Sequence, residues 1–223
     1  MRARPASPGD VGTPGWVRPR WEGTWRALGH SADPVEIAPL LAGLLARYAE
    51  PHRAYHTLVH LEECFGHWAA VRGLADRPGE VELALWYHDA VYDTHRDDNE
   101  ARSAALARAA ITGARLATAV GDRVEALILA TRHDGTPLAG DAALLADVDL
   151  AILAAPAERF DEYERQVHAE YAWVPQAIFR SKRRAILEAF LARAHIYASA
   201  PFRASSEASA RANLARSLAR LTD

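Results

Sequence analysis

The chain has 223 residues, of which half are hydrophobic and a quarter are charged, and its formal net charge at pH 7 is −3. This composition is typical of a globular protein with a substantial core, and the charge gives no general reason to expect nucleic acid as a partner. The single cysteine excludes an internal disulfide and a zinc site built from several cysteines, and no apolar run reaches the roughly 18 residues of a membrane span. Because the start of the chain lacks an apolar signal segment, we expect a cytoplasmic protein.

Helical patterns dominate the chain after a short N-terminal stretch. Residues 1–20 carry four prolines and three glycines, and we expect them to form a disordered lead-in. Apolar residues then recur with helical spacing, and we find no strand pattern. The expected helices cover residues 34–48, about 57–71, 78–88, 99 to about 118, 122–132, 141–153, 156 to about 171, 175 to about 197, and 206–221. The sequence therefore predicts an all-α fold with one domain over residues 21–223. Trp16, Trp21 and Trp25 are interpreted as a segment that docks onto this bundle or packs in it.

Histidines and aspartates are the residues that suggest chemistry. His56 and His60 lie four residues apart and share a face if one helix includes both. His88 and Asp89 are adjacent at the end of an apolar helix, where two polar side chains are costly to bury without partners. Asp149 follows 60 residues after Asp89. Imidazole and carboxylate ligands from separate helices can meet inside a bundle, and they suit Mn, Fe, Co, Ni or Zn.

The order of these residues resembles the HD superfamily of metal-dependent phosphohydrolases, in which a helical His precedes a His-Asp pair and a distant Asp. The segments RAYHTLVHLEE and WYHDAVYDTHRDDNEARSA are similar to a bacterial branch of predicted HD phosphohydrolases with little assigned biochemistry, and the motifs span about residues 55–153. The resemblance implies an HD-type helical bundle. It also implies His60, His88, Asp89 and Asp149 as ligands of one or two divalent ions (Mn, Fe, Co, Ni or Mg).

Two neighbouring residues stay open as alternatives within this resemblance. His56 competes with His60 for the role of first ligand, or it contacts a ligand from outside the ligand set. Asp147 competes with Asp149, which is preferred because a small apolar residue precedes it. Asp147 otherwise caps a helix or orients a ligand histidine.

Further residues are candidates for catalysis or for binding substrate. Asp93 stands where the hydrolases of (p)ppGpp have the Asp of a Glu-Asp pair, which implies a general acid or base; Tyr92 replaces the Glu, and a solvated loop carboxylate is the alternative. His133 ends a helix, and it either holds a second metal, contacts substrate, or is an exposed histidine favoured by the helix dipole. Arg180 and Arg184 lie on one helix face and can bind a phosphate, although a solvated face more often explains such a run.

The resemblance implies a metal-dependent phosphohydrolase that attacks a small phosphorylated substrate with a metal-activated water. A nucleotide is the most frequent kind of substrate in the superfamily. A di-iron oxygenase of HD type and a non-catalytic regulator that binds a nucleotide stay open as alternatives. As a partner we expect a small phosphorylated metabolite or nucleotide, with no nucleic acid and no membrane, and a homo-oligomer stays open.

Overall fold

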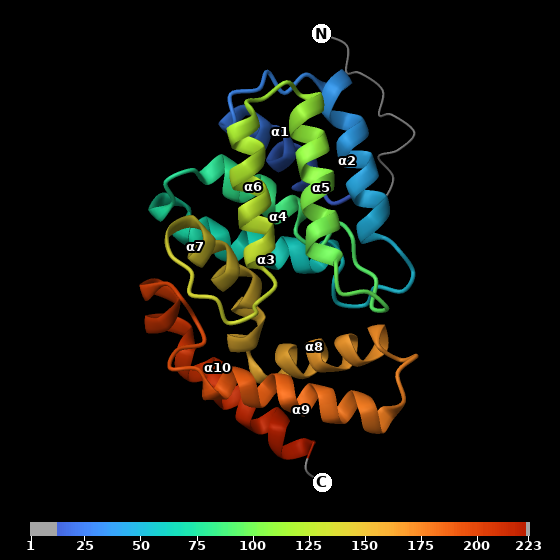
Figure 1. Cartoon of the computed structure of the whole chain (residues 1–223), viewed down its shortest axis with the longest axis vertical. Coiled ribbons are helices and arrows are strands. Elements are labelled where there is room, and N and C mark those ends of the chain that lie inside the picture. Colours follow the sequence, from blue (N-terminus) through green and yellow to red (C-terminus); the bar gives the residue numbers. More distant parts are fainter. Residues whose placement is uncertain (1–12, 222–223) are drawn as a thin grey trace.

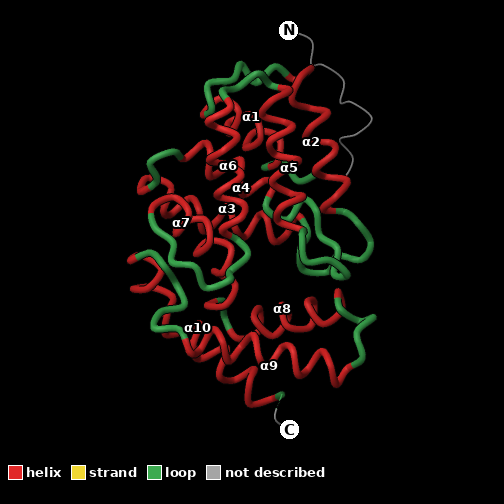
Figure 2. The backbone as a smooth tube through the Cα atoms, in the orientation of Figure 1, coloured by secondary structure: helices red, strands yellow, loops and turns green. Residues whose placement is uncertain are grey.

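The computed structural model describes residues 13–221, which contain ten α-helices, two short 3-10 helices and no β-strand (Figure 2). The α-helices are α1 (Val17–Ala27), α2 (Pro34–Tyr48), α3 (Leu58–Val71), α4 (Pro78–Tyr87), α5 (Asn99–Gly113), α6 (Thr118–Ala130), α7 (Gly140–Asp149), α8 (Ala157–Glu170), α9 (Gln176–Ala192) and α10 (Ala200–Arg220). The 3-10 helices are η1 (Arg72–Leu74) and η2 (Leu150–Ala154), which follow α3 and α7 directly. The prediction of an all-α fold is confirmed.

The helices form an upper bundle and a lower layer. In Figure 1, α1 to α7 make the upper bundle, and α8, α9 and α10 lie across its lower end. Helix α4 lies inside the bundle, packed against α1, α3, α5, α6 and α7, and each of its residues after Pro78 is buried. Its two buried carboxylates are paired, Glu80 with Arg123 and Glu82 with Arg72, as buried charges have to be. The fold therefore fixes the end of α4, and with it the His88-Asp89 pair, from several directions.

The N-terminal segment differs from the expected lead-in. Residues 1–12 lie outside the described residues, but α1 begins at Val17, which is fully buried together with Trp21 and Trp25. Pro19 falls in the first turn of α1, where a helix has no internal partner for the backbone N–H that proline lacks. The indole of Trp21 donates to the Ile37 carbonyl (3.0 Å). Burial of the aromatic side chains therefore stabilises a helix where the prolines predicted disorder, and the segment packs in the bundle.

Helix α1 also depends on one glycine of α4. A Cβ at Gly79 would lie 3.0 Å from the backbone carbonyl carbon of Ala27, tighter than most Cβ contacts in proteins. Glycine at this position lets the end of α1 approach the start of α4.

The lower layer is joined to the upper bundle through η2. Helices α8 and α10 both pack on η2, and the buried Asn213 of α10 donates to the carbonyls of Leu153 (2.9 Å) and Ala155 (2.8 Å). Helix α9 ends at Ala192 and α10 begins at Ala200, so the expected boundaries at 197 and 206 were wrong. The turn between them is held by the Glu207 carboxylate, which accepts from two of its backbone N–H groups.

None of the described helices combines the length and the apolar character needed to cross a membrane.

Candidate metal centre

Two imidazoles and two carboxylates converge where α3, α4 and α7 meet. The Nε2 atom of His60 lies 3.2 Å from Nε2 of His88, 3.2 Å from Oδ1 of Asp149 and 3.4 Å from Oδ2 of Asp89. The Nε2 atom of His88 lies 3.0 Å from Oδ2 of Asp89 and 3.4 Å from Oδ1 of Asp149. The structure thus brings together the four side chains that the HD resemblance implies as ligands.

These separations have the size that one first-row divalent cation requires. Four tetrahedral donors at about 2.0–2.1 Å from a cation lie about 3.3 Å apart, and neighbouring octahedral donors at that radius lie about 2.9 Å apart. The observed distances between donor atoms run from 3.0 to 3.4 Å. Two carboxylates also balance the charge of a divalent ion, which lowers the cost of burying it. The donor set therefore fits a metal ion.

Local structure places three of the four candidate ligand side chains. His60 lies in the first turn of α3, whose N-cap is Thr57, and it is 1% exposed. His88 follows the last residue of α4, and its Nδ1 lies 2.8 Å from the Leu85 carbonyl, so Nδ1 carries the proton and the Nε2 lone pair faces the cluster. Metal-binding histidines in proteins are commonly oriented by such a bond. Asp149 is the last residue of α7.

The pKa values of the cluster are shifted in the directions that favour charged histidines and charged carboxylates. Burial by itself lowers the pKa of His88, but the carboxylates of Asp89 and Asp149 outweigh burial and hold this pKa well above its usual value. Burial raises the pKa of Asp149, but the charge of His88 and the bonds from the histidines outweigh burial and hold it well below its usual value. Without a cation, protons on the imidazoles compensate the two carboxylates, and a metal ion has to displace them.

His133 lies against the cluster, as one interpretation of the sequence expected. Its Nε2 lies 2.8 Å from Oδ2 of Asp149. The residue has a φ of 53°, in the left-handed region that non-glycine residues rarely adopt. Arg193, at the end of α9, donates to the His133 carbonyl (2.6 Å). Strained backbone of this kind persists where surrounding contacts impose it, and it is frequent at functional sites.

His56 lies beside the cluster and lines the same cavity as His133, but it does not share a helix with His60. Helix α3 begins at Leu58, so His56 belongs to the turn before it, and the two imidazole ring centres are 5.8 Å apart. The Nδ1 atom of His56 lies 2.7 Å from Oε2 of Glu170, at the end of α8. The condition for a shared helix face is therefore not met, and the alternative of His56 as a residue that flanks the candidate ligands agrees with its position.

Cys64 is a buried neighbour of the cluster that the sequence analysis did not single out. Its Sγ lies 3.6 Å from Nε2 of His60, and donor atoms of His60, Cys64, His88 and Asp149 all lie within 4.8 Å of one another. The signal in the sequence was its position one helical turn after His60.

Two predicted carboxylates have their side chains engaged elsewhere. Oδ1 of Asp93 accepts from the backbone N–H of His95 (2.9 Å), so the side chain closes a turn in its own loop. Asp147 accepts from the backbone N–H groups of Ala198 (2.7 Å) and Ser199 (2.6 Å), just before α10. Asp147 thus caps the turn before α10, which was one of its two alternative interpretations, and the structure does not bring either carboxylate to the cluster.

The predicted phosphate-binding arginines also lie apart from the cluster. Arg180 and Arg184 of α9 donate to the carbonyl of Leu221 at the end of α10, at 3.0 and 3.1 Å. They cap that helix end because its last carbonyls lack partners within the helix. Arg183, between them, faces inward and is paired with Glu164.

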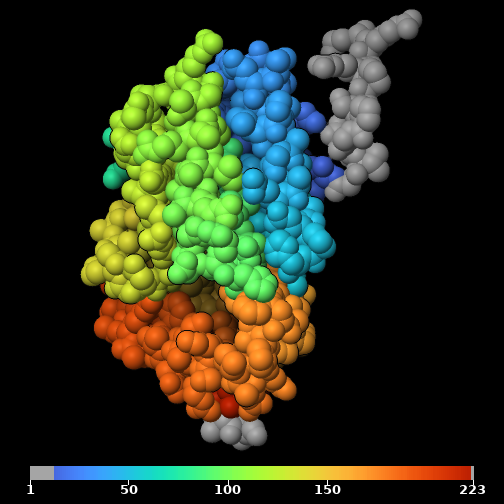
Figure 3. Space-filling view, turned by 45° about the vertical axis from the view of Figure 1, so that its right-hand side comes forward, coloured from blue at the N-terminus to red at the C-terminus, as the bar shows by residue number. Residues whose placement is uncertain are grey.

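Two cavities reach the cluster. One of about 110 Å³ is lined by His56, His133 and Asp149 together with Arg183 and apolar side chains that include Phe190. The other, of about 450 Å³, is lined by residues that include His60, Cys64, His67, Asp149 and Arg159. In the space-filling view the surface is hollowed between α5 and the C-terminal helices below it (Figure 3).

Comparisons with protein-family models, with curated proteins and with solved structures found no match to this chain. Its function has to be inferred from the chemistry of the site itself.

Proposed function

We propose that this chain is a metal-dependent phosphohydrolase of HD type that acts on a small phosphorylated substrate, with a nucleotide as the first choice. One observation carries the proposal: the Nε2 atoms of two histidines, His60 and His88, each lie 3.0 to 3.4 Å from carboxylate oxygens of Asp89 and Asp149, and a cavity reaches His60 and Asp149. A donor set of this kind suits Mn, Fe, Co or Ni.

The residues around the cluster have complementary tasks in this proposal. A divalent ion held by the four ligands would lower the pKa of a bound water and polarise a phosphoryl oxygen. His56 and His133 line the cavity beside Asp149, where their nitrogens can hydrogen-bond to phosphoryl oxygens or to water. Arg183 lines the same cavity, but its pairing with Glu164 reduces the charge it offers to a phosphate. The binding of an anion therefore depends mainly on the metal ion and the two histidines.

The test is release of phosphate or pyrophosphate from a panel of nucleotides and phosphomonoesters. Metal-free protein is reloaded with Mn, Co, Ni, Fe or Mg, and the same assays are run on Asp89→Ala. The matched control is Asp98→Ala, because the Asp98 side chain is partly exposed, pairs with Arg96 (2.6 Å) and is not one of the four candidate ligands. Metal-dependent release that is lost in Asp89→Ala and kept in Asp98→Ala supports the proposal.

A second function is favoured by the two flanking histidines. His56 and His133, together with the second carboxylate oxygens of Asp89 and Asp149, offer enough donors for a second ion. Two iron ions would suit an HD-type oxygenase. Iron-dependent oxygen uptake, with no phosphate release under any metal, would favour the oxygenase, and a bound metal with neither activity would favour a nucleotide-binding regulator.

A further inference from the structure

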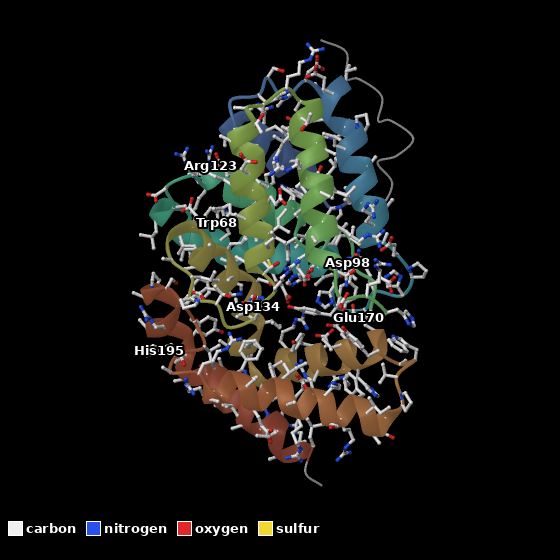
Figure 4. All side chains as sticks on the ribbon, in the orientation of Figure 1. Trp68, Asp98, Arg123, Asp134, Glu170 and His195 are labelled. Atoms are coloured by element: carbon white, nitrogen blue, oxygen red, sulfur yellow. The ribbon has the colours of Figure 1, made fainter. Side chains whose placement is uncertain are left out.

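Glu170 is a buried carboxylate that joins three segments distant in the sequence. It lies at the end of α8, and its side chain has no exposed surface. Oε1 accepts from the backbone N–H groups of Ala54 (2.8 Å), Tyr55 (2.8 Å) and His56 (2.9 Å). Oε2 accepts from the Tyr92 hydroxyl (2.9 Å) and lies 2.7 Å from Nδ1 of His56. Figure 4 shows Glu170 between α8 and the loops of the upper bundle.

This arrangement determines which nitrogen of His56 carries the proton. Both oxygens of Glu170 face donors, three backbone N–H groups on one and a phenol on the other, so the carboxylate acts only as an acceptor. The short contact to Nδ1 of His56 then requires a proton on Nδ1. A neutral imidazole with a proton on Nδ1 has a lone pair on Nε2.

The ring of His56 is also fixed in its plane. Tyr92 stacks on it, with ring centres 4.0 Å apart and an angle of 27° between the planes. The two ring nitrogens point in different directions, so Nε2 faces away from Glu170. His56 lines the cavity that also contains His133 and Asp149, and within residues 13–221 its Nε2 has no hydrogen-bonding partner.

We infer that Glu170 is a positioning residue, which holds the proton on Nδ1 of His56 and presents the Nε2 lone pair to the cavity beside the metal centre. The role that this gives His56 rests on the proposed function. In hydrolysis, Nε2 takes the proton of the attacking water while the water oxygen forms its bond to phosphorus. The ester oxygen leaves with the electron pair of the broken bond and receives that proton, so His56 returns to its starting state.

Glu170→Gln tests the inference without loss of shape. The amide oxygen can still accept from the three backbone N–H groups, which places the amide NH₂ opposite Nδ1 of His56. Since the amide donates, Nδ1 has to accept, and the proton moves to Nε2. The matched control is Glu82→Gln, because Glu82 is also buried but bonds to Trp68 and Arg72, far from His56.

The measurement is the tautomeric state of His56 in metal-free protein, from ¹⁵N chemical shifts and multiple-bond correlations, with assignment by His56→Gln. We expect a proton on Nδ1 in the wild type and in Glu82→Gln, and a proton on Nε2 in Glu170→Gln. A wild-type His56 with its proton on Nε2, or one that exchanges freely between both forms, overturns the inference even if the variant does not fold. An unchanged tautomer in folded Glu170→Gln also overturns it.

A second readout separates this inference from the proposed function. If the chain hydrolyses a substrate, Glu170→Gln should lower kcat by about 100-fold, within the range of general acid–base catalysis, and change KM little. Glu82→Gln should leave both constants unchanged. The tautomer measurement needs neither metal nor substrate, so an inactive chain with the expected tautomers refutes only the proposed function.

Discussion

Replacement of Glu170 by Gln removes one buried charge and keeps the shape of the side chain, and we expect it to cost about 3 kcal/mol of folding free energy at about pH 7. Burial raises the pKa of Glu170, but the hydrogen bonds and charge of His56 and the backbone N–H groups outweigh burial and hold it at about 2, against an ordinary value of 4.5. Each pKa unit corresponds to about 1.4 kcal/mol, so this difference gives about 3 kcal/mol.

The same linkage fixes the sign of the pH dependence. A carboxylate with a depressed pKa stabilises the fold above its unfolded pKa of 4.5 and loses this contribution as the pH falls through about 2. The difference in stability between wild type and Glu170→Gln should therefore be complete at about pH 7 and fall to about 2 kcal/mol at about pH 3.5.

Urea unfolding followed by circular dichroism measures both quantities in metal-free protein. The control is Glu62→Gln, because Glu62 is exposed on α3, and we expect it to change stability by less than about 0.5 kcal/mol. A cost for Glu170→Gln below about 1 kcal/mol, or a difference that does not change with pH, would refute the reasoning.

Three further predictions concern the metal centre. Asp89→Ala removes a ligand oxygen that lies 3.0 Å from Nε2 of His88, and we expect metal affinity to fall more than about 100-fold in calorimetric titrations; an affinity near that of wild type would contradict the ligand assignment. Binding a cation displaces protons from His60 and His88, whose pKa values are raised, so affinity should strengthen about tenfold per pH unit for each proton released, and a flat profile between about pH 6 and 8 would count against it. The folding stability of the metal-free protein should change with pH in the opposite direction. The stability that a raised histidine pKa provides is lost as the pH rises through that pKa. Arg193→Ala frees the strained backbone of His133 and should weaken metal binding about tenfold, as measured by competition with a chromophoric chelator; unchanged binding would show that this contact does not orient the site.

The sequence was informative wherever a property depends on neighbouring residues. Helical periodicity predicted most of the helices that the structure contains, since amphipathic spacing is a local feature. The N-terminus was the exception. Its prolines predicted a disordered lead-in, but the buried tryptophans of α1 hold this helix in the bundle. The order His60, His88-Asp89, Asp149 also indicated a ligand set, although it could not show that these side chains meet.

Contacts between distant segments were decided only by the tertiary structure. A shared face for His56 and His60 required one helix to include both, but α3 begins at Leu58 and places His56 in the preceding turn. Glu170 follows His56 by 114 residues and has no pattern that marks it, yet it orients that imidazole. The spacing of Arg180 and Arg184 suggested a phosphate site, but in the structure both side chains donate to the carbonyl at the end of α10. Local sequence sets helix formation through short-range spacing, whereas the partner of a buried charge is set by which helices pack together, and this depends on the whole chain.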